Sequence, residues 1–186
     1  PTPLNYYGET KLQAERAVRA AGGSSLIIRT NFYGWNARPG KQSLAEWMLT
    51  ELQAGRPLSL VEDVNFCPVF VNQLNETLFH LMDRNYTGIL HVAGSELISK
   101  LEFGRRIGRI FDENIELIRP AKVGERRLAA RRSQAMGLGI QRLKTIFPER
   151  DFSQDFSVDT GLKQFQECLK NGYIEGLQGK LQKGMR

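Results

Sequence analysis

Short apolar runs alternate with segments of helical periodicity along most of this 186-residue chain, and no other feature limits the fold as strongly. Buried strands are predicted at residues 26–28, 58–61, 67–70, 89–92 and 115–118. Helices are predicted at residues 6–21, 44–52, 74–82, 103–111 and 155–173. Strands that alternate with helices are typical of an α/β fold, in which helices cover a mostly parallel sheet.

Residues of suitable type stand at several of the expected helix ends. The two glycines at 22–23 end the first helix, because glycine readily adopts the left-handed conformation that follows a helix. Asn72 has the right side chain for an N-cap, and Ser99 with Glu102 has the spacing of a capping box. Residues 31–41 are predicted to form a loop, since they contain two glycines and a proline.

The first third of the sequence supplies too few strands for a complete doubly wound sheet. Its first strand is predicted only at Leu26, after a helix. Neither G-x-G-x-x-G nor G-x-x-G-x-x-G occurs between a strand and a helix, although such a turn holds the dinucleotide in a Rossmann sheet. We therefore expect the N-terminal half of the sheet, with that turn, to lie outside this sequence.

The composition is that of an ordinary globular domain, with 41% hydrophobic and 25% charged residues. No apolar run approaches the roughly 20 residues that a membrane-spanning helix needs, so we expect a cytoplasmic protein without a membrane partner. Cys67 and Cys168 are far apart and have no other metal ligands near them in sequence. They are interpreted as thiols rather than as a disulfide, and no metal site is expected.

The net charge of +6 comes from one stretch, Arg119 to Lys144, which holds eight basic residues and one acidic residue, Glu125. A basic stretch can bind nucleic acid, a membrane surface or a small anion, or it can simply be a solvated face. Nucleic acid would call for interleaved aromatic side chains, and the nearest one, Phe147, lies just beyond the stretch. A phosphorylated small molecule is therefore a better candidate than nucleic acid.

Tyr7 and Lys11 are four residues apart on the first predicted helix, so their side chains leave from the same face. A cation beside a phenol favours the phenolate form and makes the phenol a better acid and base near neutral pH. Reduction of a carbonyl by hydride needs such a group, because negative charge develops on the carbonyl oxygen. Taken alone, the pair is also compatible with a surface lysine beside a packing tyrosine.

Several motifs occur together and in a recognisable order. Residues 3–15 read P-x-N-x-Y-G-x-T-K-L-x-x-E, and 26–36 read LIIRTNFYGWN. Further along stand DVNFCPVFVN at 63–72, GILHVAG at 88–94 and SKLEF at 99–103. In this order they resemble the C-terminal part of extended short-chain dehydrogenase/reductases. The closest resemblance is to the sugar-nucleotide reductases of the dTDP-4-dehydrorhamnose reductase type.

The resemblance implies an NAD(P)H-dependent reduction of a 4-keto sugar nucleotide in deoxysugar biosynthesis. Tyr7 would protonate the sugar oxygen at C4, and Lys11 would orient the NADPH or NADH and assist Tyr7. Thr30 and Asn31 would lie where the loop after the strand meets nicotinamide and substrate. Asn31 would also reach the diphosphate, and Phe32 would contact the substrate.

The remaining expected contacts with the sugar nucleotide come from later segments. Phe66 and Pro68 match the segment that lines the pocket, and Arg131 matches an arginine that approaches the nucleotide phosphates. The pattern departs from the family where Arg132 replaces a proline and where residues 136–139 lack the usual S-L-D. These departures leave open a substrate different from that of the best-known members.

The resemblance also divides the chain. Residues 1–36 would complete the Rossmann domain with its catalytic helix. Residues 37–175 would form mainly the small substrate-binding subdomain with returning Rossmann elements, and 176–186 a polar tail. A homodimer is possible. Two alternatives remain open: an epimerase or dehydratase of the same family, and a non-catalytic subunit like the regulatory subunit of methionine adenosyltransferase.

Overall fold

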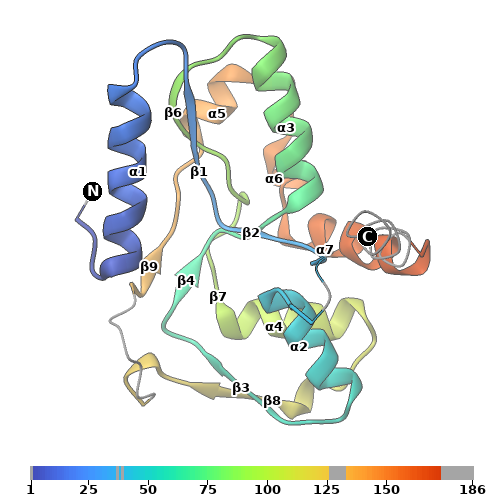
Figure 1. Cartoon of the computed structure of the whole chain (residues 1–186). Coiled ribbons are helices and arrows are strands. Elements are labelled where there is room, and N and C mark those ends of the chain that lie inside the picture. Colours follow the sequence, from blue (N-terminus) through green and yellow to red (C-terminus); the bar gives the residue numbers. More distant parts are fainter. Residues whose placement is uncertain (1, 37, 39, 126–132, 173–186) are drawn as a thin grey trace, which may run out of the picture.

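The computed structural model describes residues 2–36, 38, 40–125 and 133–172. These residues form an elongated α/β body with two hydrophobic cores, one at each end of the view in Figure 1. Short strands connect the two ends. The expected α/β class is confirmed.

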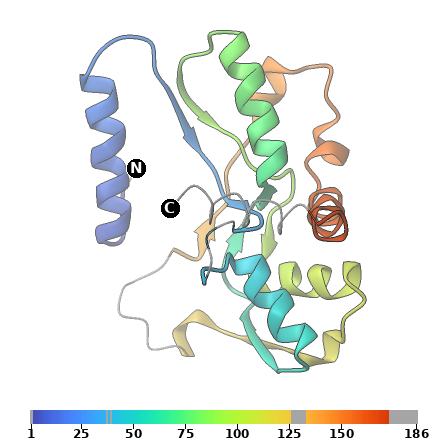
Figure 2. The same ribbon diagram turned by 45° about the vertical axis from the view of Figure 1, so that its right-hand side comes forward.

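The first core lies around a parallel pair of strands, β1 (Leu26–Arg29) and β6 (Gly88–His91). Helices α1 (Tyr6–Ala20) and α3 (Val71–Asp83) lie on opposite sides of this pair, as Figures 1 and 2 show from two directions. The short helices α5 (Gln141–Ile146) and α6 (Phe152–Asp155) complete this end. Its buried side chains include Leu74, Leu81, Leu90, Leu143, Phe147 and Phe156.

Helix α1 stands apart from both cores, because none of its residues is buried. Its N-cap is Asn5, whose side chain accepts a hydrogen bond from the backbone N–H of Gly8 at 2.9 Å. A two-pronged ion pair between Glu15 of α1 and Arg29 of β1 ties the helix to the strand.

The second core lies between α2 (Leu44–Gln53), α4 (Lys100–Ile110) and a second parallel strand pair. That pair is β3 (Leu58–Val61) with β8 (Ile118–Ala121). Helix α7 (Val158–Lys170) packs against α4 and closes the core with Phe165. Each helix buries one face, because its apolar side chains recur every three to four residues.

Between the two ends lie strands of two residues each. β2 (Phe32–Tyr33) pairs in parallel with β5 (Val69–Phe70). A three-stranded sheet follows the order β7-β4-β9, with bounds Ile98–Ser99, Asn65–Phe66 and Ala135–Met136. β4 is antiparallel to β7 and parallel to β9. Two 3₁₀ turns, η1 (Ile115–Leu117) and η2 (Val123–Glu125), flank β8.

Several sequence-based boundaries were wrong. The predicted loop at 31–41 contains β2, and the strand predicted at 67–70 is split, with Cys67 and Pro68 outside both β4 and β5. Helix α3 is capped at Phe70 rather than at Asn72. The cause is a side chain inside the helix. Gln73 accepts a hydrogen bond from the Phe70 N–H at 3.1 Å, so a backbone donor at the start of the helix has a partner.

Two further differences concern the C-terminal half. The strand predicted at 115–118 is a 3₁₀ turn that enters β8 only at Ile118. The helix predicted at 155–173 is interrupted at Phe156, and Ser157 caps the new helix α7 through the N–H of Thr160. The capping box of α4 forms by half: Ser99 accepts from the Glu102 N–H at 3.1 Å, while the Glu102 carboxylate binds arginines.

Candidate functional site

A cavity of about 250 Å³ lies where α2, α4, β2 and the β7-β4-β9 sheet meet. Its lining is mainly apolar and comes from Asn31, Phe32, Tyr33, Ser43, Leu44, Phe66, Lys100, Phe103 and Met136. Three of the residues expected in the substrate site, Asn31, Phe32 and Phe66, are therefore brought together here.

The three-stranded sheet forms one wall of this cavity. Phe66 on β4 lies opposite Ile98 of β7 on one side and Met136 of β9 on the other. Beyond the β7 strand, the backbone N–H of Lys100 donates to the carbonyl of Val64 at 3.1 Å. These pairings bring the Lys100 Nζ to 3.1 Å from the centroid of the Phe66 ring, a cation–π contact.

Asn31 connects the opposite wall of the cavity to residues 67–68, the short segment between β4 and β5 (the Cys67 turn). Its backbone carbonyl accepts from the N–H of Val69 at 3.1 Å, and its Oδ1 accepts from the N–H of Cys67 at 3.3 Å. The amide nitrogen of Asn31 donates to the Thr30 carbonyl at 3.2 Å. The Asn31 side chain thus positions the segment between β4 and β5 as well as lining the cavity.

The N-terminus of α2 contributes the rim. Ser43 and Glu46 form a complete capping box, in which each side chain accepts from the other residue's backbone N–H. The same Glu46 carboxylate accepts from the N–H of Asn36 at 2.9 Å, so the loop after β2 is fastened to the helix. Phe32 is 62% exposed and Leu44 is 39% exposed, which leaves apolar surface at the rim.

Aromatic side chains support the cavity from behind. The Tyr33 ring lies edge-on to Phe103, with centroids 5.0 Å apart, and Phe103 is edge-on to Phe66 at 5.3 Å. Such pairs contribute about 0.5–1.5 kcal/mol each beyond the burial of their area. Burial, with a smaller effect of the Asp159 charge, raises the pKa of the Tyr33 hydroxyl far above its usual value. Tyr33 therefore acts as a neutral wall and not as an acid or base.

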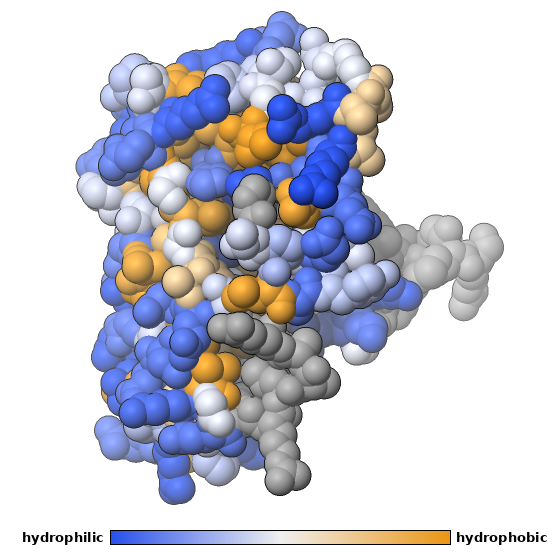
Figure 3. Space-filling model, turned by 90° about the vertical axis from the view of Figure 1, so that its left-hand side faces the viewer, coloured by the Kyte–Doolittle hydropathy of each residue, from blue (hydrophilic) through white to orange (hydrophobic). Residues whose placement is uncertain are grey.

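Tyr7 and Lys11 are not among the residues that line this cavity. They lie on α1, where the Lys11 Nζ is 5.3 Å from the centroid of the Tyr7 ring and Tyr7 is 70% exposed. The predicted juxtaposition on one helix face is present. The side of the molecule that carries α1 shows apolar patches between hydrophilic residues (Figure 3).

The other expected site residues have different surroundings. Thr30 follows β1, and its Oγ1 is buried without a hydrogen-bond partner among the described residues. Pro68 is buried, and its carbonyl faces Gly94 so closely that a Cβ there would lie 2.1 Å from the oxygen. Arg131 and the polar tail lie outside the described residues.

The lining residues that were not among the site residues expected from the sequence are Tyr33, Ser43, Leu44, Lys100, Phe103 and Met136. Lys100 directly follows Ser99, a recognisable N-cap, but its position beside Phe66 depends on strand pairing between distant segments. Met136 belongs to a segment that departs from the family pattern, and this departure was the one sequence signal of its involvement.

In the described parts of the chain no three His, Cys, Asp or Glu side chains are grouped as metal ligands. None of the described helices is both long and apolar enough to cross a bilayer.

Comparison with known proteins agrees with this architecture. Residues 1–166 match the RmlD substrate binding domain. The probable low-salt glycan biosynthesis reductase Agl14 of Haloferax volcanii is 30% identical over 121 residues, which are 63% of this chain and 40% of that protein. The dTDP-4-dehydrorhamnose reductase of Mycolicibacterium smegmatis is 31% identical over 120 residues, which are 63% of this chain and 36% of that protein. The chain thus spans well under half the length of these curated relatives.

Solved structures give the same result. The dTDP-4-dehydrorhamnose reductase of Bacillus anthracis in complex with NADP superposes with a TM-score of 0.77 at 25% identity, covering 89% of this chain and 56% of that one. The dTDP-glucose 4,6-dehydratase of the same organism, at 15% identity and a TM-score of 0.68 over 92% of this chain and 54% of that one, shares the fold. The expected relationship to extended short-chain dehydrogenase/reductases is confirmed: this chain belongs to the RmlD substrate binding domain family.

Proposed function

We propose that this chain is the substrate-binding part of an NAD(P)H-dependent reductase that acts on a 4-keto sugar nucleotide of the dTDP-4-dehydrorhamnose type. The observation that carries the proposal is the pair Tyr7 and Lys11, exposed on one face of α1 in a chain that also contains the cavity around Asn31 and Phe66. The dinucleotide-binding half would belong to the rest of the protein.

In this proposal Tyr7 is the general acid. Its hydroxyl donates a proton to the oxygen at C4 of the sugar as that oxygen gains negative charge. Lys11 stabilises the phenolate that remains, because its ammonium is held beside the ring. Exposure of both side chains leaves them accessible to a bound substrate.

The residues present also suit a nicotinamide cofactor, which when bound supplies the hydride. Lys11 carries donors for ribose hydroxyls. The Thr30 hydroxyl is a buried polar group that lacks a partner among the described residues, so a ligand amide or hydroxyl would satisfy it. Lys11 and Thr30, together with Tyr7 and Asn31, are the residues of this chain that we assign to the cofactor.

The test is oxidation of NADPH or NADH by the whole protein in the presence of dTDP-4-dehydrorhamnose. Replacement Tyr7→Phe should lower turnover at least 100-fold, about the contribution of a general acid. Tyr6→Phe is the matched control, because Tyr6 is the neighbouring tyrosine and is 84% exposed. Turnover near the wild-type rate in Tyr7→Phe would refute this mechanism. Absence of turnover in the wild-type protein would favour a non-catalytic subunit.

A further inference from the structure

Glu15 lies along the same side of α1 as the two residues assigned to proton transfer. Tyr7, Lys11 and Glu15 follow one another at intervals of four residues, so their side chains are arranged in a row on the helix. Tyr7 and Lys11 are exposed, whereas the Glu15 side chain is only 19% exposed. The row that carries the proposed acid therefore ends in a shielded carboxylate.

This carboxylate is bound by Arg29, the last residue of β1. The Arg29 Nε donates to Glu15 Oε1 at 2.8 Å, and a terminal nitrogen of the guanidinium donates to Oε2 at 2.7 Å. Two parallel hydrogen bonds to a planar guanidinium restrain the direction of a contact as well as its length. The pair therefore limits both the rotation of α1 and its movement along the strand.

Surrounding charges keep this pair ionised at neutral pH. The hydrogen bonds from Arg29 hold the pKa of Glu15 below its usual range, with a smaller contribution from His91 in its charged form. His91 stands opposite Arg29 in the register of β1 with β6, and its Nδ1 lies 3.2 Å from the Gly139 carbonyl oxygen. The ion pair is consequently formed at neutral pH.

Hydrophobic packing fixes α1 less firmly than it fixes the other α-helices of the described chain. None of the α1 residues is buried, and neither hydrophobic core includes one of its side chains. Figures 1 and 2 show α1 beside the β1–β6 pair, on the side opposite to α3. Elements with few buried apolar contacts open locally at a low cost in free energy. A directional ion pair is thus well placed to determine where the residues of α1 lie.

The strand end to which α1 is fixed leads directly into the candidate site. Arg29 is followed by Thr30 and Asn31, which we assign to the cofactor and the substrate, and Asn31 lines the cavity. Tyr7 stands eight residues before Glu15, about 12 Å along the helix axis at 1.5 Å per residue. A small change in the tilt of α1 at Glu15 therefore moves Tyr7 relative to these ligand contacts.

We propose that Glu15 and Arg29 act as a positioning pair for the reduction, by holding Tyr7 and Lys11 in place relative to the ligands at the end of β1. This inference rests on the proposed function. In this assignment neither Glu15 nor Arg29 touches the reacting atoms, so their effect on the reaction passes through the orientation of α1. Misplacement of a general acid by about 1 Å can slow turnover about 100-fold, which makes such an effect measurable.

The experiment is a double-mutant cycle on the whole protein, with kcat and KM measured for dTDP-4-dehydrorhamnose. Glu15→Gln and Arg29→Met should each lower kcat about tenfold or more, because either change releases α1. KM should change less than about twofold, because the residues that line the cavity come from other elements. The double variant should lose no more than either single variant, since the pair acts as a unit. Additive losses in kcat, or wild-type kcat in Glu15→Gln, would overturn the positioning role and leave the proposed function standing.

A solvent deuterium isotope effect distinguishes positioning from a loss of folded protein. A displaced acid makes proton transfer more rate-limiting, so the isotope effect on kcat should rise in Glu15→Gln. A smaller folded fraction lowers kcat without changing the isotope effect, and an unchanged effect would therefore overturn the proposal. Glu51→Gln is the control, because it breaks the doubly hydrogen-bonded Glu51–Arg56 pair at the end of α2. It should leave kcat, KM and the isotope effect at their wild-type values.

A second variant decides the question if Glu15→Gln is not folded by circular dichroism. Arg29→Lys keeps the positive charge and loses the two-pronged geometry. It should lower kcat and raise the isotope effect to a smaller extent than the loss of the whole pair. Wild-type values for both quantities in Arg29→Lys would overturn the proposal.

Absence of turnover in the wild type would refute the proposed function, and the position of α1 is then measured without turnover. Spin labels are attached through Gln13→Cys on α1 and Asn75→Cys on α3. Cys67→Ala and Cys168→Ser remove the native thiols. The distribution of distances between the labels should be broader in Glu15→Gln than in the wild type. An equally narrow distribution would show that the pair does not position the helix.

Discussion

The hydroxyl of Tyr33 lies against the backbone of Gly161, where a Cβ atom would be only 2.4 Å from the phenolic oxygen. The same Cβ would lie 3.2 Å from Phe70 Cβ and from Gln73 Oε1, so three atoms from other residues crowd the position that a side chain at 161 would occupy. The glycine in α7 thereby allows the tyrosine to enter the core that supports the cavity.

We predict that Gly161→Ala lowers the free energy of unfolding, because overpacking of a tight core costs about 1–3 kcal/mol. Part of this cost is offset, since alanine is a better helix former than glycine by about 1 kcal/mol. The loss should therefore be smaller in the Tyr33→Phe background, where the nearest of the three obstructing atoms is gone. Urea unfolding of the four proteins measures this coupling.

Gly124→Ala is the control for this pair, because a Cβ at Gly124 would meet nothing within 4 Å. Equal effects of Gly161→Ala with and without the tyrosine hydroxyl would contradict the prediction. Tyr33→Phe alone should be neutral or slightly stabilising, since the buried hydroxyl has no partner among the described residues.

The Glu15–Arg29 pair should make the attachment of α1 depend on pH. Its oxygen and nitrogen atoms are 2.7 and 2.8 Å apart, and the hydrogen bonds from Arg29 hold the pKa of Glu15 below its usual value of 4.5. A lowered pKa in the folded state means that the pair stabilises the protein above pH 4.5 and loses this effect as the pH falls further.

We predict that Glu15→Gln costs about 1 kcal/mol at pH 7, the order expected for a partly exposed charged pair with two hydrogen bonds. The difference from wild type should shrink toward zero near pH 3. Glu51→Gln is the control, because Glu51 lies on α2 and forms the same kind of doubly hydrogen-bonded pair, with Arg56. Amide hydrogen exchange in α1 should accelerate at pH 7 in Glu15→Gln and stay unchanged in Glu51→Gln. Identical protection of α1 in both variants would contradict the role assigned to the pair.

The helices and the Tyr7–Lys11 pair could be predicted because their information is local. Apolar spacing along α2 and α4 directly reports which face is buried, and residues four apart on a helix lie together in any context. The family motifs likewise led to Asn31, Phe32 and Phe66, which do share one cavity.

What could not be predicted depends on contacts between distant segments. Two-residue strands such as β4 and β9 are too short to show any periodicity, so the approach of Met136 to Phe66 is invisible in the sequence. The start of α3 was misplaced because Phe70 is a poor N-cap by residue type, and the Gln73 side chain compensates for it. Lys100 was overlooked for the same reason as Met136, since strand register brings it to the ring.

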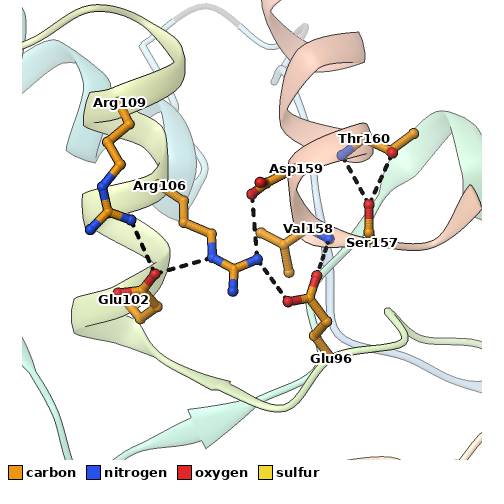
Figure 4. A network of polar contacts seen from close by, with 8 residues as sticks. All are labelled: Glu96, Glu102, Arg106, Arg109, Ser157, Val158, Asp159 and Thr160. Atoms are coloured by element: carbon orange, nitrogen blue, oxygen red, sulfur yellow. Dashed lines mark hydrogen bonds and ion pairs between the residues drawn. The ribbon is translucent and has the colours of Figure 1, made fainter. Parts of the chain in front are cut away.

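Arg106 connects three acidic side chains from different parts of the chain. It contacts Glu96 at 2.7 Å, Glu102 at 3.2 Å and Asp159 at 3.3 Å, while Glu96 also accepts from the Val158 N–H at the start of α7 (Figure 4). Removal of this one cation would leave three carboxylates close together. The junction of α4 with α7 should therefore depend on it.

We predict that Arg106→Met lowers the free energy of unfolding by about 1–3 kcal/mol, between the values for exposed and for buried ion pairs. Arg109→Met is the matched control, because Arg109 is more exposed and contacts Glu102 alone among these acids. It should change stability by less than about 0.5 kcal/mol. Guanidinium titrations followed by tryptophan fluorescence give both numbers, and equal values for the two arginines would rule the prediction out.

Asn31 should control access to the Cys67 thiol. Cys67 is 6% exposed, and its backbone N–H is held by the Asn31 side chain. Asn31→Ala removes that acceptor and should cost about 1 kcal/mol of local stability. In a Cys168→Ser background the thiol should then react with Ellman's reagent about fivefold faster, because opening of the turn is easier.

Asn114→Ala supplies the control for the thiol measurement. Asn114 also accepts a backbone N–H, that of Glu116, but it lies at the 3₁₀ turn before β8. Its replacement should leave the reaction rate of Cys67 unchanged. An unchanged rate in Asn31→Ala would mean that the Cys67 turn is held by its other contacts.

The sheet β7-β4-β9 joins three dipeptides whose paired residues lie 32 to 70 positions apart, from the Phe66–Ile98 pair to the Asn65–Ala135 pair. Contacts of such long sequence separation form late in folding, since the entropy of closing the intervening loops must first be overcome. One wall of the cavity thus exists only after most of the chain has reached its native topology. Ligand affinity at this wall would consequently be a measure of completed folding, because partly folded chains would lack the wall and would not bind.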